Sequence, residues 1–215
     1  MTHTLHRFRM HRKLDEDSAD YIVMVMAAQG FNDTGAEDRL RQALDILAAC
    51  DPVNLADDNW GGIYTGETVE GLKDKITGTA YIAAVFADPW QLRVALLHLG
   101  VANLGLSVVV TGEPQETWPL IRGVGLDIHT INLSLGAWGN TDRLPPAPVL
   151  ALTSMCGHGL ISPAFARDVA RRVGSGRLSP REGAVELASV CTCGMFNVTE
   201  AERLLARGEV TGDDS

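Results

Sequence analysis

The sequence predicts a mixed α/β or α+β fold, in which two related strand–helix–strand units form a sheet covered by helices. A small C-terminal segment of three helices follows and carries a cysteine cluster. Two observations lead to this prediction. A faint internal repeat runs through the first two-thirds of the 215-residue chain, and the pattern changes to short capped helices after a proline-rich stretch.

The internal repeat joins an apolar run to a helix with the shared motif L-R-x-A-L. YIVMVMAAQGFND at 21–33 is followed by RLRQALDIL at 39–47. YIAAVFADPW at 81–90 is followed by QLRVALLHL at 91–99. The apolar runs are rich in β-formers, and the leucines of both later stretches recur at helical spacing. Each unit therefore begins as a strand followed by a helix.

Each predicted helix leads into a second short strand, VNLAD at 53–57 and LSVVVTG at 106–112. The unit is thus strand–helix–strand, present twice, and a ferredoxin-like pair of halves is one topology that suits it. A short helix near 116–123 and a further strand at 126–139, LDIHTINLSLGAWG, complete an α/β body that spans residues 1–143.

The stretch LPPAPV at 144–149 marks a linker, because its three prolines cannot lie inside a helix or a central strand. Residues 150–208 beyond it read as three short helices joined by glycine-containing loops, and 209–215 form a loose polar tail. Capping residues mark where the three helices start, at Ser162, Ser179 and Thr199.

Composition and charge restrict the class of partner. The formal net charge is −9, which argues against nucleic acid, because phosphate binding depends on Lys and Arg. No apolar run has the length of a membrane span or a signal peptide. We expect a cytoplasmic protein with reduced thiols, a small-molecule substrate and, plausibly, a homodimer.

The basic stretch HTLHRFRMHRK at 3–13 is a local exception to the acidic charge. Three interpretations fit it: a basic arm, an outer strand with one solvated face, or a histidine cluster that binds a metal. Because it contains few apolar residues, the strand is the favoured interpretation and nothing sharper follows.

The four cysteines divide into two groups. Cys50 lies at the end of an apolar helix and is expected to pack as a small hydrophobe. Cys156 lies in the loop TSMCGHGLIS at 153–162, and Cys191 and Cys193 lie in the loop CTCG before the last helix. Three cysteines in glycine-containing loops, off the apolar stripes of the helices, indicate a metal or a cluster rather than packing.

Two kinds of metal centre remain open, and an iron–sulfur cluster is favoured over zinc. In the first, Cys156, Cys191 and Cys193 hold a [4Fe–4S] cluster whose fourth iron is left for substrate, with His158 beside it as acid or base. This centre predicts a non-redox lyase or hydrolase, of the dehydratase or desulfidase kind, acting on a small polar metabolite. In the second, the three cysteines and His158 bind a structural zinc that holds the helical segment together. The protein would then be a binding or assembly protein without catalysis.

The five residues Met155 to Gly159, MCGHG, resemble the catalytic stretch of the proline racemase and hydroxyproline epimerase family. The resemblance covers five of 215 residues. It implies a cofactor-independent isomerase in which Cys156 acts as acid or base. Those enzymes need a second cysteine, which here would be Cys191 or Cys193, in an unrelated context.

A second glycine-rich loop, DDNWGGIYTG at 57–66, supplies the candidate substrate-binding residues Asn59, Trp60 and Tyr64. Its acids, amide and aromatic pair are typical of a turn that faces a ligand. A surface turn whose aromatic rings fold onto the sheet is the simpler interpretation. The loop matches neither nucleotide-binding glycine pattern, so ATP and NAD receive little support.

Overall fold

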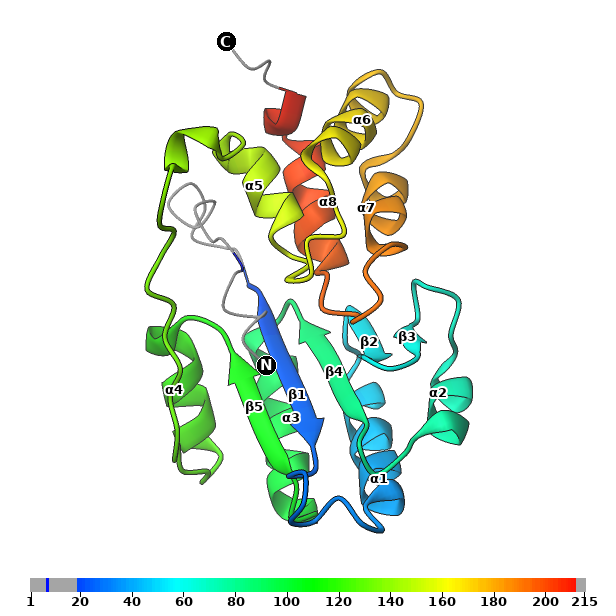
Figure 1. Cartoon of the computed structure of the whole chain (residues 1–215), viewed down its shortest axis with the longest axis vertical. Coiled ribbons are helices and arrows are strands. Elements are labelled where there is room, and N and C mark those ends of the chain that lie inside the picture. Colours follow the sequence, from blue (N-terminus) through cyan, green and yellow to red (C-terminus); the bar gives the residue numbers. More distant parts are fainter. Residues whose placement is uncertain (1–6, 8–18, 212–215) are drawn as a thin grey trace.

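The structure is a computed structural model that describes residue 7 and residues 19–211. Its centre is a five-stranded antiparallel sheet in the order β3-β2-β4-β1-β5 (Figure 1). The strands are β1 (Tyr21–Met26), β2 (Asn54–Asp57), β3 (Gly61–Gly62), β4 (Tyr81–Phe86) and β5 (Ser107–Thr111). The predicted mixed α/β class is confirmed.

The two predicted strand–helix–strand units are both present, and they interleave. The first unit is β1, α1 (Glu37–Ala48) and β2, and the second is β4, α3 (Pro89–Ala102) and β5. Strand β4 lies between β1 and β2, and β1 lies between β4 and β5. With the short β3 and α2 (Val69–Lys75) set aside as an insertion, this is the ferredoxin-like arrangement.

The sheet has a core on each face because its strands alternate. Tyr21, Val23 and Val25 of β1 join a core with the leucines of α1 and α3. Ile22, Met24 and Met26 face the other way and join a core with the C-terminal helices. The central strands are therefore buried on both sides, and the helical segment shares its core with one face of the sheet.

The C-terminal segment has one helix more than predicted, and it lies at one end of the sheet (Figure 1). The additional helix α5 begins inside the proline-rich stretch, because proline is tolerated in the first turn of a helix. The last helix starts from Asn197 and not from Thr199. The four helices are α5 (Ala147–Thr153), α6 (Pro163–Gly174), α7 (Pro180–Ala188) and α8 (Val198–Ala206).

Two of the predicted helix starts are confirmed in detail. The Ser162 hydroxyl accepts from the N–H of Phe165 at the start of α6. Ser179 and Glu182 form a reciprocal capping box at the start of α7. These caps fix where each helix begins, and so fix the loops that carry the cysteines.

The predicted strand at 126–139 is wrong. The chain leaves α4 (Pro114–Gly123) and continues to α5 without a strand, apart from a single 3-10 turn at Thr141–Arg143. Strand-like alternation alone did not produce pairing, because a strand also needs a neighbour to bond with. The predicted strand at 3–13 lies outside the described residues except for Arg7. No helix among the described residues is long and apolar enough to cross a membrane.

Candidate metal centre

The two cysteine loops lie where they were expected. Cys156 occupies the loop at 154–162 between α5 and α6, and Cys191 and Cys193 occupy the loop at 189–197 between α7 and α8. All three side chains are buried. The helices bring the two loops together, although 35 positions separate Cys156 from Cys191 along the chain (191 minus 156).

The three sulfur atoms form one compact group. The Sγ atoms of Cys191 and Cys193 are 3.6 Å apart. The ligand atoms of Cys156, Cys193 and His158 all lie within 4.8 Å of one another. His158 is exposed, unlike the cysteines. These three residues could hold a metal ion, with two buried sulfurs and one imidazole at the surface, and the sulfur of Cys191 lies beside that of Cys193.

The thiols share one site, and this decides their ionisation. Hydrogen bonds from Cys191 and Cys193, and from the backbone N–H groups of Leu160 and His158, lower the pKa of Cys156. Hydrogen bonding to Cys156 raises the pKa of Cys191, and hydrogen bonding to Cys156 and Cys191 raises that of Cys193. One thiolate is therefore favoured and further ones are not. A bound cation would remove that penalty, because coordinated thiols lose their protons.

Arg7 joins the two loops from outside the helical segment. Its Nη1 donates to the carbonyl oxygen of Met155 at 2.6 Å and to that of Met195. Its Nε and Nη2 donate to the two carboxylate oxygens of Asp20 at 2.8 and 2.5 Å. Both charged side chains are buried, so a paired, hydrogen-bonded guanidinium fixes one residue in each of the two cysteine loops.

Two asparagines attach the second cysteine loop to the sheet. Asn197 Nδ2 donates to Asp20 Oδ1 at 2.9 Å, while its Oδ1 caps α8 by accepting from the N–H of Glu200 at 3.0 Å. Asn54 Nδ2, from β2, donates to the carbonyl oxygen of Phe196 at 3.0 Å. Sequence analysis missed Arg7, Asp20 and both asparagines. The basic stretch was the only signal, and it did not identify Arg7.

Cys50 takes no part in this group. It is buried in the core between the sheet and α1, and burial raises the pKa of its thiol. The prediction that it packs as a small hydrophobe is confirmed.

The loop at 57–66 does not bring its three candidate residues to one place. The hydroxyl of Tyr64 accepts from Arg181 of α7 at 3.2 Å, so Tyr64 turns toward the helical segment. Trp60 lies beneath the ammonium of Lys75, and Asn59 donates to Asp57. Their role in substrate binding stays a prediction.

The chain matches no known family model, and comparison with curated proteins and with solved structures finds no significant similarity.

Proposed function

We propose that this chain binds one tetrahedral metal ion, zinc ahead of other metals, through Cys156, Cys191, Cys193 and His158. The single observation that carries this proposal is the contact between the sulfurs, with Cys191 Sγ 3.6 Å from Cys193 Sγ. Two thiolates bound to the same zinc at about 2.3 Å in tetrahedral geometry are about 3.8 Å apart. The spacing of these two sulfurs therefore suits one shared ion.

The surroundings support a structural role for this ion. Three thiolates and a neutral imidazole give the complex a net negative charge, which weakens the metal as a Lewis acid. The sulfurs are buried, and neither they nor His158 line the cavity of about 870 Å³ found beside β5 in the described part of the chain. The ion would fasten α5, α6, α7 and α8 to one another over the end of the sheet.

A [4Fe–4S] cluster is the second candidate, favoured by the number of sulfurs and by the exposed fourth position at His158. Three cysteines leave one iron of such a cluster free for substrate. That iron would support loss of water or sulfide from a small polar metabolite, with His158 as acid or base. Each cysteine of a cluster binds a different iron and so stands apart from the others. This candidate therefore requires the sulfurs of Cys191 and Cys193, which are 3.6 Å apart within one loop, to move apart.

The test is metal analysis of protein purified without oxygen, with zinc and iron both supplied during expression. We expect about one zinc per chain and no visible colour. Replacing Cys156, Cys191 or Cys193 with Ser should remove the zinc. Cys50→Ser is the matched control, because Cys50 is equally buried but packs in the other core, and it should keep the metal.

Other results would overturn the zinc proposal in distinct ways. A brown protein with iron and acid-labile sulfide, bleached by the same three substitutions, would establish the cluster. A colourless protein without metal, whose Cys156 reacts fast with iodoacetamide, would favour the cofactor-independent isomerase.

A further inference from the structure

We propose that two copies of this chain associate through residues 128–135. In each copy, this segment forms a strand in the cavity beside β5 of the other copy. The proposal goes beyond metal binding and does not depend on it.

The segment has the side-chain pattern of a strand with one apolar face. In IHTINLSL the odd-numbered positions Ile131, Leu133 and Leu135 are apolar, and they are 51%, 63% and 84% exposed. Trp138, just beyond, is 81% exposed. Every residue from 129 to 144 is exposed. A contiguous apolar row of this kind on the surface marks an interface, since single exposed apolar residues are common but aligned ones are not.

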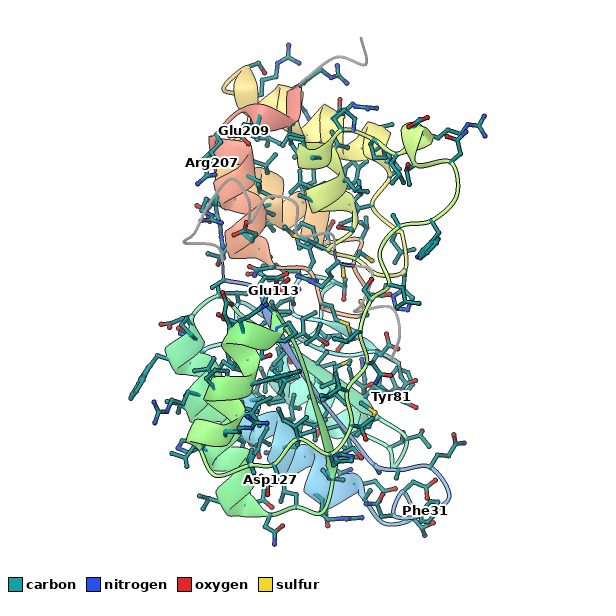
Figure 2. All side chains as sticks on the ribbon, turned by 90° about the vertical axis from the view of Figure 1, so that its left-hand side faces the viewer. Phe31, Tyr81, Glu113, Asp127, Arg207 and Glu209 are labelled. Atoms are coloured by element: carbon teal, nitrogen blue, oxygen red, sulfur yellow. The ribbon has the colours of Figure 1, made fainter. Side chains whose placement is uncertain are left out.

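The backbone of the segment has one side-chain partner among the described residues, since the carbonyl oxygen of Leu135 accepts from Trp138 Nε1 at 3.1 Å. Among the described residues, no backbone–backbone hydrogen bond is made by any N–H or C=O group of residues 128–135. Figures 1 and 2 show the chain running from the α4 end, near Asp127, along the body to the helical segment as an extended trace. Extended backbone with alternating apolar side chains is suited to pairing with another strand.

A space for that strand exists on the same molecule. Within residues 7 and 19–211, β5 is the last strand of the sheet and pairs with β1 alone. A cavity of about 870 Å³ lies between β5 and the segment at 126–134. Suppose that the segment of each copy enters the cavity of the other. Four strands would then lie side by side across the dimer, in the order β5 of the first copy, segment of the second copy, segment of the first copy and β5 of the second copy. This order is symmetric about a twofold axis, so the interface closes with two copies.

Charge favours a second copy over a different partner. Residues 128–141 contain no Asp, Glu, Lys or Arg, although the whole chain carries a net charge of −9. Two copies repel each other over most of their acidic surfaces, and this uncharged strip is where the repulsion is smallest. A basic partner would instead be drawn to the acidic surface elsewhere.

The experiment is sedimentation equilibrium of the full-length chain as purified, over a wide range of concentration. The wild type should be a dimer. Leu133→Asp places a charge in each of the two paired strands, and Asn132→Pro removes a backbone donor. Each should raise the dimer dissociation constant by at least about 100-fold. Trp90→Asp is the matched control: Trp90 is 65% exposed on α3 but does not line the cavity, and the variant should stay dimeric.

Hydrogen exchange gives an independent measure of the pairing. The amides of 128–135 should be protected in the wild-type dimer and exchange freely in Leu133→Asp, whose far-UV circular dichroism reports that it is folded. A wild type that is monomeric at every concentration would overturn the proposal. So would a dimer that Leu133→Asp and Asn132→Pro leave unchanged, or one whose 128–135 amides are unprotected.

Discussion

Gly194 lies directly on Ala56: a Cβ added at Gly194 would stand 2.2 Å from the Cβ of Ala56 and 3.2 Å from its backbone nitrogen. The backbone at Gly194 also has a positive φ of 64°. The loop with Cys191 and Cys193 thus contacts β2 with no side chain between them. Its position depends on glycine both for space and for backbone conformation.

Gly194→Ala should therefore lower the free energy of unfolding of the metal-loaded protein by about 3 kcal/mol, through overpacking added to left-handed backbone strain. Ala56→Gly in the same chain removes one methyl from the clash and should restore part of the loss. Urea denaturation measures both effects. Gly176→Ala is the control, because Gly176 has a φ of 72° and nothing within 4 Å of its added Cβ. It should cost about 1 kcal/mol, and an equal cost at both glycines would contradict the packing argument.

Arg7→Met should weaken metal binding by about 10- to 100-fold, because the guanidinium of Arg7 hydrogen-bonds to one backbone carbonyl in each cysteine loop and so holds the two loops in place. Arg7→Lys should recover only part of the affinity, because one ammonium cannot donate to Asp20 and to two carbonyls in the same geometry. Competition with a chromophoric chelator measures the affinity. Arg177→Met, at an exposed position between α6 and α7, is the control and should bind metal as the wild type does. Unchanged affinity in Arg7→Met would show that the loops keep their positions without Arg7.

The buried carboxyl of Asp57 should make the free energy of unfolding depend on pH. The side chain is buried at the end of β2, and its Oδ2 has no hydrogen-bond partner among the described residues. Burial raises the pKa of the carboxyl above that of an unfolded chain, near 3.9. The folded state thus binds the proton of the Asp57 carboxyl more tightly than the unfolded state does. The stabilisation that this proton gives is present below the unfolded pKa and is lost as the pH rises through the folded pKa.

Asp57→Asn should accordingly be more stable than the wild type at neutral pH by roughly 1 kcal/mol, because it removes a buried charge and keeps an acceptor for Asn59. The difference should shrink as the pH falls toward the unfolded pKa. Urea denaturation at a series of pH values tests this. Asp58→Asn, at the half-buried neighbour, serves as control. A gap between Asp57→Asn and the wild type that is constant with pH would show that ionisation of Asp57 is not its cause.

Removal of the metal should loosen the helical segment more than the sheet. A chelator removes the ion that joins the two cysteine loops, while β1 and β4 keep their ladder hydrogen bonds and the core formed with α1 and α3. Hydrogen exchange should therefore accelerate in α5–α8 well before it does in β1 and β4. If hydrogen exchange accelerated uniformly, the metal would stabilise the whole chain as one unit. If it did not accelerate, the metal would not stabilise the helical segment.

The sheet and the cysteine group were predictable from sequence because each has a local signal. The repeated apolar runs followed by L-R-x-A-L located β1, β4 and the helices after them, since their residues obey strand and helix periods. The capped helix starts at Ser162 and Ser179 placed Cys156, Cys191 and Cys193 in loops. Helix packing then determined that the loops meet.

The parts that were missed lack a local signal. Arg7 acts through Asp20, Met155 and Met195, which are up to 188 positions away, and no sequence pattern encodes such contacts. The segment at 126–139 has the right pattern for a strand but no partner within the described chain. Pairing depends on a neighbour, which alternation cannot supply.

X-ray absorption spectroscopy of the anaerobically purified protein reports the atoms around the metal. Zinc bound by Cys156, Cys191, Cys193 and His158 should give a zinc edge with three sulfur neighbours at about 2.3 Å and one nitrogen neighbour at about 2.0 Å. Cys193→Ser should lower the number of sulfur atoms bound to the metal, and Cys50→Ser should leave that number unchanged. This pair of results would show that the cysteine group binds the metal. An iron edge with a nearby iron neighbour, or a zinc shell without sulfur, would contradict binding of zinc by these four residues.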